Sequence, residues 1–305
     1  MRKKIALWVS QQRQLPYRLR KSIVKKIHPA LLNNHQFEVD FYGLRYAGNT
    51  NNSTDRLFFM FGGCEKYMLS LLKDYIISQK KNDAVFLDVG AHVGNHALFM
   101  SKYVRKVHSF EPNPVVRNSL ESNLKLNEIN NVIVYPLGLG DVNETIPFYV
   151  PKKDHLSCGS FCSDHDKRNE YYTDLDVRIG DDVVREKNIK NIEIVKIDVE
   201  GFERKVIEGL ARTLDKYRPM VVLEVSGTTR NKFGSKDDFE SVFPENYSFY
   251  QFSGVSREKD TYNLTKFDYD LHDNHLDVIA VPKEKQVFLG SSVTKKLKRN
   301  KVVGG

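Results

Sequence analysis

The hydrophobic pattern in the middle of the chain alternates between short apolar runs and longer amphipathic stretches. The apolar runs have the length of buried parallel strands, and they fall at residues 85–89, 132–135, 192–197, 221–225 and 276–281. Between them, apolar residues recur at helical spacing, which predicts helices over about 65–79, 115–127 and 202–214. Strands that alternate with helices predict an α/β domain with a largely parallel sheet and helices on both faces.

The strand at 85–89 leads into a glycine turn around which the domain is organised. Gly90 and Gly94 let the backbone bend sharply, and the helix that follows offers free N–H groups to a nucleotide. Asp88, before the first glycine, suits a ligand that brings cations rather than phosphates, such as S-adenosylmethionine (SAM). Glu111 ends the next strand, where a carboxylate accepts hydrogen bonds from ribose hydroxyls. The turn predicts a SAM site, and an unspecialised doubly wound domain is the alternative.

The pattern divides the chain into four parts. Residues 1–36 form a basic amphipathic arm, and residues 65–284 form the α/β domain. Residues 37–61 alternate apolar and polar positions with turn signals, which predicts a hairpin or small meander and a β element over 37–64. Residues 151–176 are polar and irregular, which predicts a lid or substrate loop, and residues 285–305 form a basic tail.

The charge of the chain lies at its ends. The formal net charge is +8, yet nine bases and no acid precede Glu38, and five bases without an acid follow Ser291. Without these fourteen bases the body carries about −6. Such ends suit anionic lipid, nucleic acid or an acidic partner.

The N-terminal arm carries an apolar stripe at four-residue spacing. Its members are Leu15, Leu19, Ile23 and Ile27, with basic residues between them. An interfacial helix on an anionic membrane has this pattern, and so does a helix that docks on the protein's own core. We expect a cytoplasmic protein, peripheral at the inner face of the membrane if the first alternative holds. The chain has no apolar run of about 20 residues, no clear signal peptide and too few cysteines for a disulfide framework.

Four segments of the α/β domain together resemble the FkbM-type SAM-dependent methyltransferases. They are Phe86–His96, Ser109–Pro112, Leu137–Asp141 and the Lys-Ile-Asp-Val-Glu-Gly block at 196–201. The resemblance covers about residues 65–282 and implies a Rossmann-like seven-stranded sheet with a reversed final hairpin, and O-methylation, often of sugars. The SAM-binding set is then Asp88, Gly90, His92, Gly94, Asn95, Glu111, Pro112, Gly140 and Asp141. His92 stands where the family often has asparagine, and Asp141 either approaches adenine or caps a turn.

Acids at the carboxyl ends of two strands supply candidates for the chemistry. In O-methylation a hydroxyl oxygen attacks the methyl group while the enzyme aligns the two, and a general base takes the proton. Asp198 is the first candidate, Glu224 and the loop residue His155 are the others, and Asp198 has binding of the SAM ammonium as its alternative role. Lys196 is expected to pair with an acid. His155, Cys158, Cys162 and His165 are too tightly spaced for a zinc site, so no metal is expected.

The sequence therefore predicts a SAM-dependent O-methyltransferase that acts on a sugar hydroxyl of a cell-surface polysaccharide or glycolipid. The alternative is an RNA methyltransferase that uses the basic ends. Nucleic acid is disfavoured because base N-methylation usually uses an Asn/Asp-Pro-Pro-aromatic turn, and this chain has Asp198-Val199-Glu200-Gly201 there. A SAM-fold scaffold without activity is disfavoured by the intact acidic and glycine positions. The oligomeric state is left open.

Overall fold

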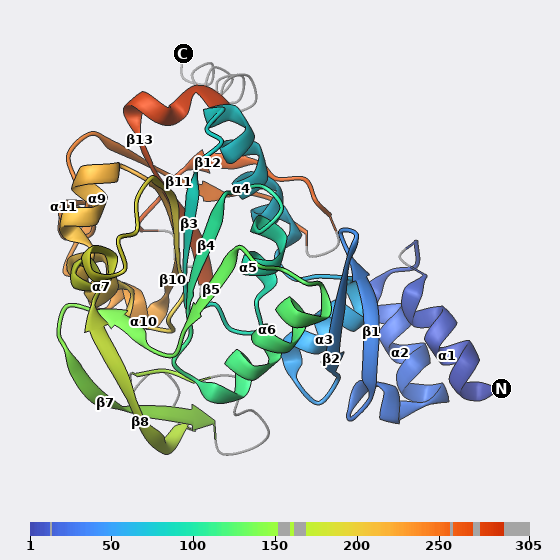
Figure 1. The fold of residues 1–305 in the computed structure, drawn as a ribbon. Helices are drawn as coiled ribbons and strands as arrows, with labels where there is room; N and C mark the ends of the chain where they lie inside the picture. Colours follow the sequence, from blue (N-terminus) through green and yellow to red (C-terminus); the bar gives the residue numbers. More distant parts are fainter. Residues whose placement is uncertain (13, 152–158, 162–168, 257–258, 271–274, 290–305) are drawn as a thin grey trace, which may run out of the picture.

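A computed structural model describes residues 1–289 except 13, 152–158, 162–168, 257–258 and 271–274, and its strands form three sheets (Figure 1). The largest has eight strands in the order β12-β11-β13-β10-β9-β3-β4-β5. Their bounds are β3 Val85–Val89, β4 Lys106–Phe110, β5 Val132–Tyr135, β9 Ile192–Ile197, β10 Met220–Ser226, β11 Tyr247–Phe252, β12 Leu264–Lys266 and β13 His275–Pro282.

The sheet confirms the predicted α/β class. Neighbouring strands from β5 to β10 pair in parallel, whereas β13 runs antiparallel to β10 and to β11. This is the Rossmann-like arrangement of seven strands with a reversed final hairpin, and β12 adds an eighth strand at the edge.

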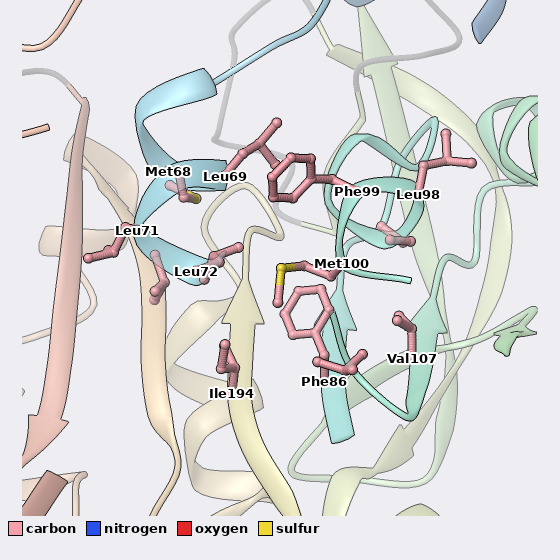
Figure 2. Packing of buried hydrophobic residues seen from close by; sticks show 14 of the residues in the cluster. Met68, Leu69, Leu71, Leu72, Phe86, Leu98, Phe99, Met100, Val107 and Ile194 are labelled. Atoms are coloured by element: carbon pink, nitrogen blue, oxygen red, sulfur yellow. The ribbon is translucent and has the colours of Figure 1, made fainter. Parts of the chain in front are cut away.

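Helices cover both faces of this sheet because its strands alternate their side chains between two apolar clusters. Phe86, Val107 and Ile194 face one side, where they pack against helices α4 to α6 (Figure 2). Leu87 and Val195 face the other side, toward α7 to α9 and α11. The bounds are α4 Lys66–Gln79, α5 Asn95–Met100, α6 Pro114–Leu126, α7 Gly180–Glu186, α8 Glu203–Gly209, α9 Ala211–Tyr217, α10 Gly227–Arg230 and α11 Lys236–Ser241.

The predicted β element is a hairpin followed by a helix. Strands β1 (Gln36–Phe41) and β2 (Leu44–Asn49) pair antiparallel, as expected. Residues 53–61 form α3 (Ser53–Phe61), so the strand prediction is wrong there. The side chain of Asn52 accepts a hydrogen bond from the amide of Thr54 and caps the helix, and the aromatic run at its end is buried on the domain.

A small sheet lies beside the main one and was not expected. It has the order β6-β8-β7, with bounds β6 Gly138–Gly140, β7 Glu144–Pro151 and β8 Asn169–Ile179. The predicted loop over 151–176 is therefore wrong for its last part, where β8 runs antiparallel to β7. The second half of β8 alternates apolar and polar residues, with Leu175, Val177 and Ile179 at every second position, so a local strand signal was present there and was missed.

The N-terminal arm is docked on the protein. It contains α1 (Arg2–Gln11), α2 (Tyr17–Ile27) and the 3-10 turn η1 (Pro29–Leu32). Ile23 and Ile27 of the apolar stripe pack against a cluster shared with α3. The buried guanidinium of Arg20 donates hydrogen bonds to the carbonyls of Ser10, Leu15 and Met60. Across the described residues, no helix is long and apolar enough to cross a membrane.

Candidate active site

Two neighbouring cavities lie where the parallel strands of the main sheet end. The first has a volume of about 260 Å³ and is lined at the ends of β3, β4, β9 and β10 by Val89, Phe110, Asp198 and Glu224. The second, of about 410 Å³, is lined by Leu57, Phe61, Gly63, Cys64, Glu65, Tyr67, Glu224 and Asp277. Both include Leu57, Cys64, Glu65 and Glu224 in their lining, so these residues form a shared wall. The crevice outside the carboxyl ends of the strands is where such sheets bind ligands.

The glycine turn is fixed by packing as well as by backbone conformation. Gly90 has a φ of +78°, and a Cβ there would lie 1.8 Å from the carbonyl oxygen of Asp198. Gly94 has a φ of +92°, and a Cβ there would lie 2.4 Å from Leu120 Cδ1 of α6. Both residues therefore have to be glycine. Gly90 lines the first cavity, whereas Gly94 lies outside its lining.

Glu111 is held in one orientation by backbone amides. Its Oε2 accepts from the N–H of His92 at 2.8 Å, and its Oε1 accepts from the N–H of Asn113 at 2.9 Å. Burial raises the pKa of Glu111 to about 7, against the effect of these two bonds. The carboxylate lines the cavity with its remaining lone pairs available to a ligand hydroxyl.

Asp88 is a buried acid without a close partner. Its side chain is fully buried behind the turn, and neither oxygen has a hydrogen bond of normal geometry within the described structure. Burial raises its pKa to about 6, although Lys196 and the amide of Ala97 favour the charged form. Asp88 does not line the cavity. Its charge is only partly compensated, which suits a ligand that brings positive charge to the turn.

Lys196 connects the end of β9 to the glycine turn. Its Nζ donates to Oδ2 of Asp198 at 2.9 Å and to the carbonyl of Gly90 at 3.3 Å. The prediction that Lys196 pairs with an acid is confirmed. Burial acts to raise the pKa of Asp198, but the ammonium of Lys196 holds it below its ordinary value. Asp198 is therefore a paired carboxylate rather than one that takes up a proton readily.

Three carboxylates gather beside this pair. One oxygen each of Asp198, Glu200 and Glu224 lie within 4.8 Å of one another, a spacing at which three oxygens can hold one cation. Asp198 already has Lys196 as its counter-ion, and the sequence predicts no metal here.

The other part of the first cavity is aromatic. Phe148, Phe161 and Phe202 form a continuous wall, with ring centroids 5.2 Å apart for the first pair and 5.4 Å apart for the second. The hydroxyl of Ser160 donates to the carbonyl of Glu200 and ties this wall to the turn after β9. Sequence reasoning missed these aromatic residues because two of them come from segments around the unexpected sheet. Phe202 directly follows the Lys-Ile-Asp-Val-Glu-Gly block, and that position was the available signal.

The structure brings together part of the set predicted from the sequence. Gly90, His92, Asn95, Glu111, Pro112, Asp198 and Glu224 line the first cavity. Asp88, Gly94, Gly140 and Asp141 lie outside its lining, and His155 lies outside the described residues. Asn95 also has a structural role, because its amide bonds both the N–H and the carbonyl of Cys64.

Asp141 is displaced because β6 joins the small sheet. Its Oδ1 lies 3.9 Å from Nζ of Lys205, while Gly138 and Leu139 line the cavity in its place. Sequence reasoning also missed Glu65 and His96, which line the first cavity as well. His96 Nε2 lies 3.3 Å from Glu65 Oε2.

The sheet order and the cavity at the glycine turn define an α/β domain of the nucleotide-cofactor-binding class, with the topology of SAM-dependent methyltransferases. Residues 88–251 match the model of the Methyltransferase FkbM domain family, which is more than half of the chain. The chain therefore belongs to the FkbM family of SAM-dependent methyltransferase domains.

Named relatives match at low identity. The Hexuronic acid methyltransferase AglP of Haloferax volcanii is 26% identical over 147 residues, which cover 48% of this chain and 58% of that protein. Methyltransferase 1 of Beauveria bassiana is 26% identical over 160 residues, which cover 45% of this chain and 63% of that protein. The chain thus spans about 60% of the length of these relatives.

Solved structures resemble the chain more distantly. A SAM-dependent methyltransferase from Agrobacterium tumefaciens has a TM-score of 0.46 at 8% identity and covers 81% of this chain and 70% of its own. TYW2 from M. jannaschii, solved with AdoMet, has a TM-score of 0.39 at 14% identity and covers 81% of this chain and 85% of its own.

Proposed function

We propose that this protein is a SAM-dependent O-methyltransferase that methylates a sugar hydroxyl of a polysaccharide or glycolipid. The observation that carries the proposal is the first cavity, which combines an aromatic wall with fixed acids beside a glycine turn. The acids suit the ammonium and sulfonium of SAM, and the buried charge of Asp88 favours a cationic ligand over a dinucleotide phosphate. The second cavity shares a wall with the first and offers room for an acceptor.

Different residues of the cavity lining suit different parts of SAM. We assign the ribose hydroxyls to Glu111, whose carboxylate is already oriented by the amides of His92 and Asn113. The aromatic wall of Phe148, Phe161 and Phe202 suits adenine. The acidic part of the lining suits the methionine portion of SAM. Asp88 lies behind the turn and attracts the positive charges of that portion at a distance.

When bound, SAM supplies an electrophilic methyl group on a sulfonium. The chain would then have to align an acceptor hydroxyl and take its proton, so that the O–H bond and the carbon–sulfur bond of SAM break as the oxygen binds the methyl, with S-adenosylhomocysteine as the leaving group. Glu65 and Glu224 line both cavities and can reach an acceptor there. Burial and nearby carboxylates raise the pKa of Glu65 to about 8, so its ionised form can take a proton from the acceptor and hold it near neutral pH. We propose Glu65 for this role, with Glu224 as the second candidate and Asp198 as a group that orients Lys196.

The acidic lining also bears on the acceptor class. The acids Glu65, Glu224 and Asp277 disfavour a phosphate backbone, because a phosphate beside them would meet carboxylates of its own charge or force them to stay protonated; this supports a sugar over RNA. The name of the Haloferax volcanii relative, a hexuronic acid methyltransferase, supports a saccharide for this chain. A sugar built on a lipid carrier would be presented at a membrane surface.

The outer face of the N-terminal helices suits contact with such a surface. Ile23 and Ile27 pack inward, while Met1, Ile5, Trp8 and Leu19 are exposed, Trp8 by 61%. Lys and Arg residues of α1 and α2 lie between these exposed apolar side chains in sequence. We propose that this face, rather than the whole stripe, contacts anionic lipid.

Calorimetry and a methyl-transfer assay test the function. SAM should bind the purified chain and NAD should not. Labelled methyl should pass from SAM to a saccharide in a panel of cell-surface glycans and RNA. Glu65→Gln should lower turnover and leave SAM affinity within about three-fold, whereas Glu111→Ala should weaken SAM by about 1–3 kcal/mol. Binding of NAD without SAM, or transfer to RNA alone, would contradict the proposal.

A further inference from the structure

We infer that His96 is a positioning residue for the proposed base, because its Nε2–H donates to Oε2 of Glu65 and leaves Oε1 for the acceptor hydroxyl. The inference rests on the proposed function and adds a second residue to its proton transfer. Three features carry it: the contact of α5 with the residues before α4, the buried ring nitrogen of His96, and the backbone conformation of Glu65.

The start of α5 holds the residue before Glu65 by its backbone. The side chain of Asn95 accepts from the N–H of Cys64 at 3.4 Å and donates to the carbonyl of Cys64 at 3.1 Å. Asn95 and His96 are consecutive at the start of α5, as Cys64 and Glu65 are before α4. The two helices also pack against each other in the apolar cluster on this face of the sheet (Figure 2). The fold itself therefore brings the ring of His96 beside Glu65.

The ring nitrogen Nε2 of His96 is buried next to the Glu65 carboxylate. His96 is 4% exposed, and its Nε2 lies 3.3 Å from Oε2 of Glu65 without a hydrogen bond of normal geometry in the described part of the chain. Buried polar atoms almost always have a partner, and a small rotation of either side chain completes a bond at this distance.

The protonation state of His96 makes it a donor. Burial, and then the charge of Lys196, hold the pKa of His96 well below its usual range, so the ring is neutral and carries one proton. A nitrogen lone pair that faced an ionised carboxylate oxygen would be repelled by it. The proton of the ring therefore belongs on Nε2, where it can be donated to Oε2 of Glu65.

Glu65 has a backbone conformation that residues other than glycine seldom adopt. Its φ is +44° and its ψ is +44°, and although it is the N-cap residue of α4, its side chain does not cap the helix. Such conformations persist where the surrounding structure fixes them, and they cluster at functional sites. The Glu65 side chain is 39% exposed and lines both cavities. One carboxylate oxygen can thus bind His96 while the other meets an acceptor.

A neutral donor suits a base that has to keep its affinity for a proton. Burial and nearby carboxylates raise the pKa of Glu65 to about 8, and a donor to the ionised form moderates this effect. The titratable groups around Glu65 are Lys196 and Asp198 of β9, Asp88 of β3, Glu224 of β10, Asp277 of β13 and Tyr67 of α4. Lys196 is already paired with Asp198. When Oε1 of Glu65 takes the hydroxyl proton, the bond from His96 to Oε2 stays, and no proton passes to the ring.

Nitrogen NMR of the unliganded full chain, labelled with ¹⁵N-histidine, reads the tautomer of His96 directly. The resonances are assigned with His96→Gln. We expect Nε2 to carry the proton and Nδ1 to carry none between about pH 6 and pH 9. A proton on Nδ1 with none on Nε2, or a charged ring in this range, would overturn the inference. This measurement uses the unmodified protein, so it decides the matter even where a variant does not fold.

His96→Leu and His96→Gln isolate the hydrogen bond, because glutamine keeps a side-chain N–H near the position of Nε2 and leucine does not. Ionisation of Glu65 is followed by ¹³C NMR of the unliganded chain labelled at its glutamate carboxyls, with Glu65→Gln for assignment. The midpoint should rise by about 1 pH unit in His96→Leu, since the ionised form loses a donor, and should stay within about 0.3 pH unit in His96→Gln.

The matched control for this titration is His108→Leu. His108 is also a buried histidine, but it lies outside the lining of both cavities, so the variant should leave the Glu65 midpoint unchanged. A midpoint that does not rise in His96→Leu, or that rises equally in His96→Gln or in His108→Leu, would refute the role of His96.

Turnover is then measured with the acceptor that the glycan panel identifies. His96→Leu should lower kcat at least ten-fold at pH 7, move the acid limb of the pH profile upward and leave SAM affinity within about three-fold, while His96→Gln should retain most of the activity. An unchanged kcat in His96→Leu would also overturn the inference. If the unmodified chain methylates no glycan, the proposed function fails, whereas the tautomer and the Glu65 titration still decide whether His96 orients Glu65.

Discussion

Asp88→Asn should separate the stability of the protein from its affinity for SAM. Asparagine has the shape of aspartate and removes the charge that is buried behind the glycine turn. At pH 8 the unliganded variant should be at least as stable as the wild type, while SAM should bind it more weakly. The physical reason is that the same buried charge opposes folding and attracts a cationic ligand.

The magnitude follows from the pKa of Asp88. Burial raises it from 3.8 to about 6, a shift of roughly two units, so ionising the group in the folded state costs about 3 kcal/mol. The buried amide of the variant is itself unpaired and costs about 1–3 kcal/mol. The two terms leave a net gain of about 0–2 kcal/mol at pH 8. Near pH 4, where Asp88 is protonated in the folded state, only the cost of the amide remains.

The direction in which the stability difference changes with pH follows from the raised pKa of Asp88. Because the folded-state pKa is raised, the favourable contribution of Asp88 is complete below about 3.8 and is lost as the pH rises through about 6. The free energy of unfolding of the variant relative to the wild type should therefore rise by about 2.5 kcal/mol between pH 4 and pH 8. Urea unfolding of both proteins without ligand across this range measures it, and calorimetry gives the SAM affinity.

Asp74→Asn serves as the control, since the side chain of Asp74 is about half exposed whereas that of Asp88 is fully buried. A difference that stays constant or falls with pH would refute the claim that the buried charge of Asp88 opposes folding. Unchanged SAM affinity in the variant would refute its role in attracting the cofactor.

Three other changes test the turn, the arm and its outer face. Gly90→Ala should lower the free energy of unfolding by more than about 2 kcal/mol and abolish SAM binding, because the new Cβ would lie 1.8 Å from the carbonyl oxygen of Asp198. An unchanged melting temperature would show that the turn can shift. Arg20→Met should cost about 3 kcal/mol, since it leaves buried carbonyls unpaired, and should speed proteolysis of α1 and α2; no change in urea unfolding would speak against the docked arm. Trp8→Ala should weaken binding to anionic vesicles and leave activity on a soluble acceptor intact; equal binding by both proteins would remove this face as the contact.

The elements of the main sheet could be predicted from the sequence because their signals are local. The strand over 132–135 and the glycine turn follow from apolar runs and from residues whose conformational limits act over a few positions. The alternation of side chains along a strand puts Asp88 on the same face as Phe86, and in the structure Asp88 is fully buried. The edge of the sheet that would bind a ligand was fixed by the order of strands and helices alone.

The site itself was decided by contacts between distant segments. Strand β8 pairs with β7, and this pairing, together with the bridge between Tyr149 and Ser160, holds Phe148 and Phe161 at the cavity. Asp141 follows a strand that belongs to the small sheet, so its carboxylate lies near Lys205 and not in the cavity lining. Glu65 and Asp277 are about 200 residues apart in the sequence, yet they line one cavity because α4 packs beside the reversed strand β13. Local sequence patterns do not encode such contacts, because these contacts depend on where whole helices and strands lie and on which of their side chains face the cavity.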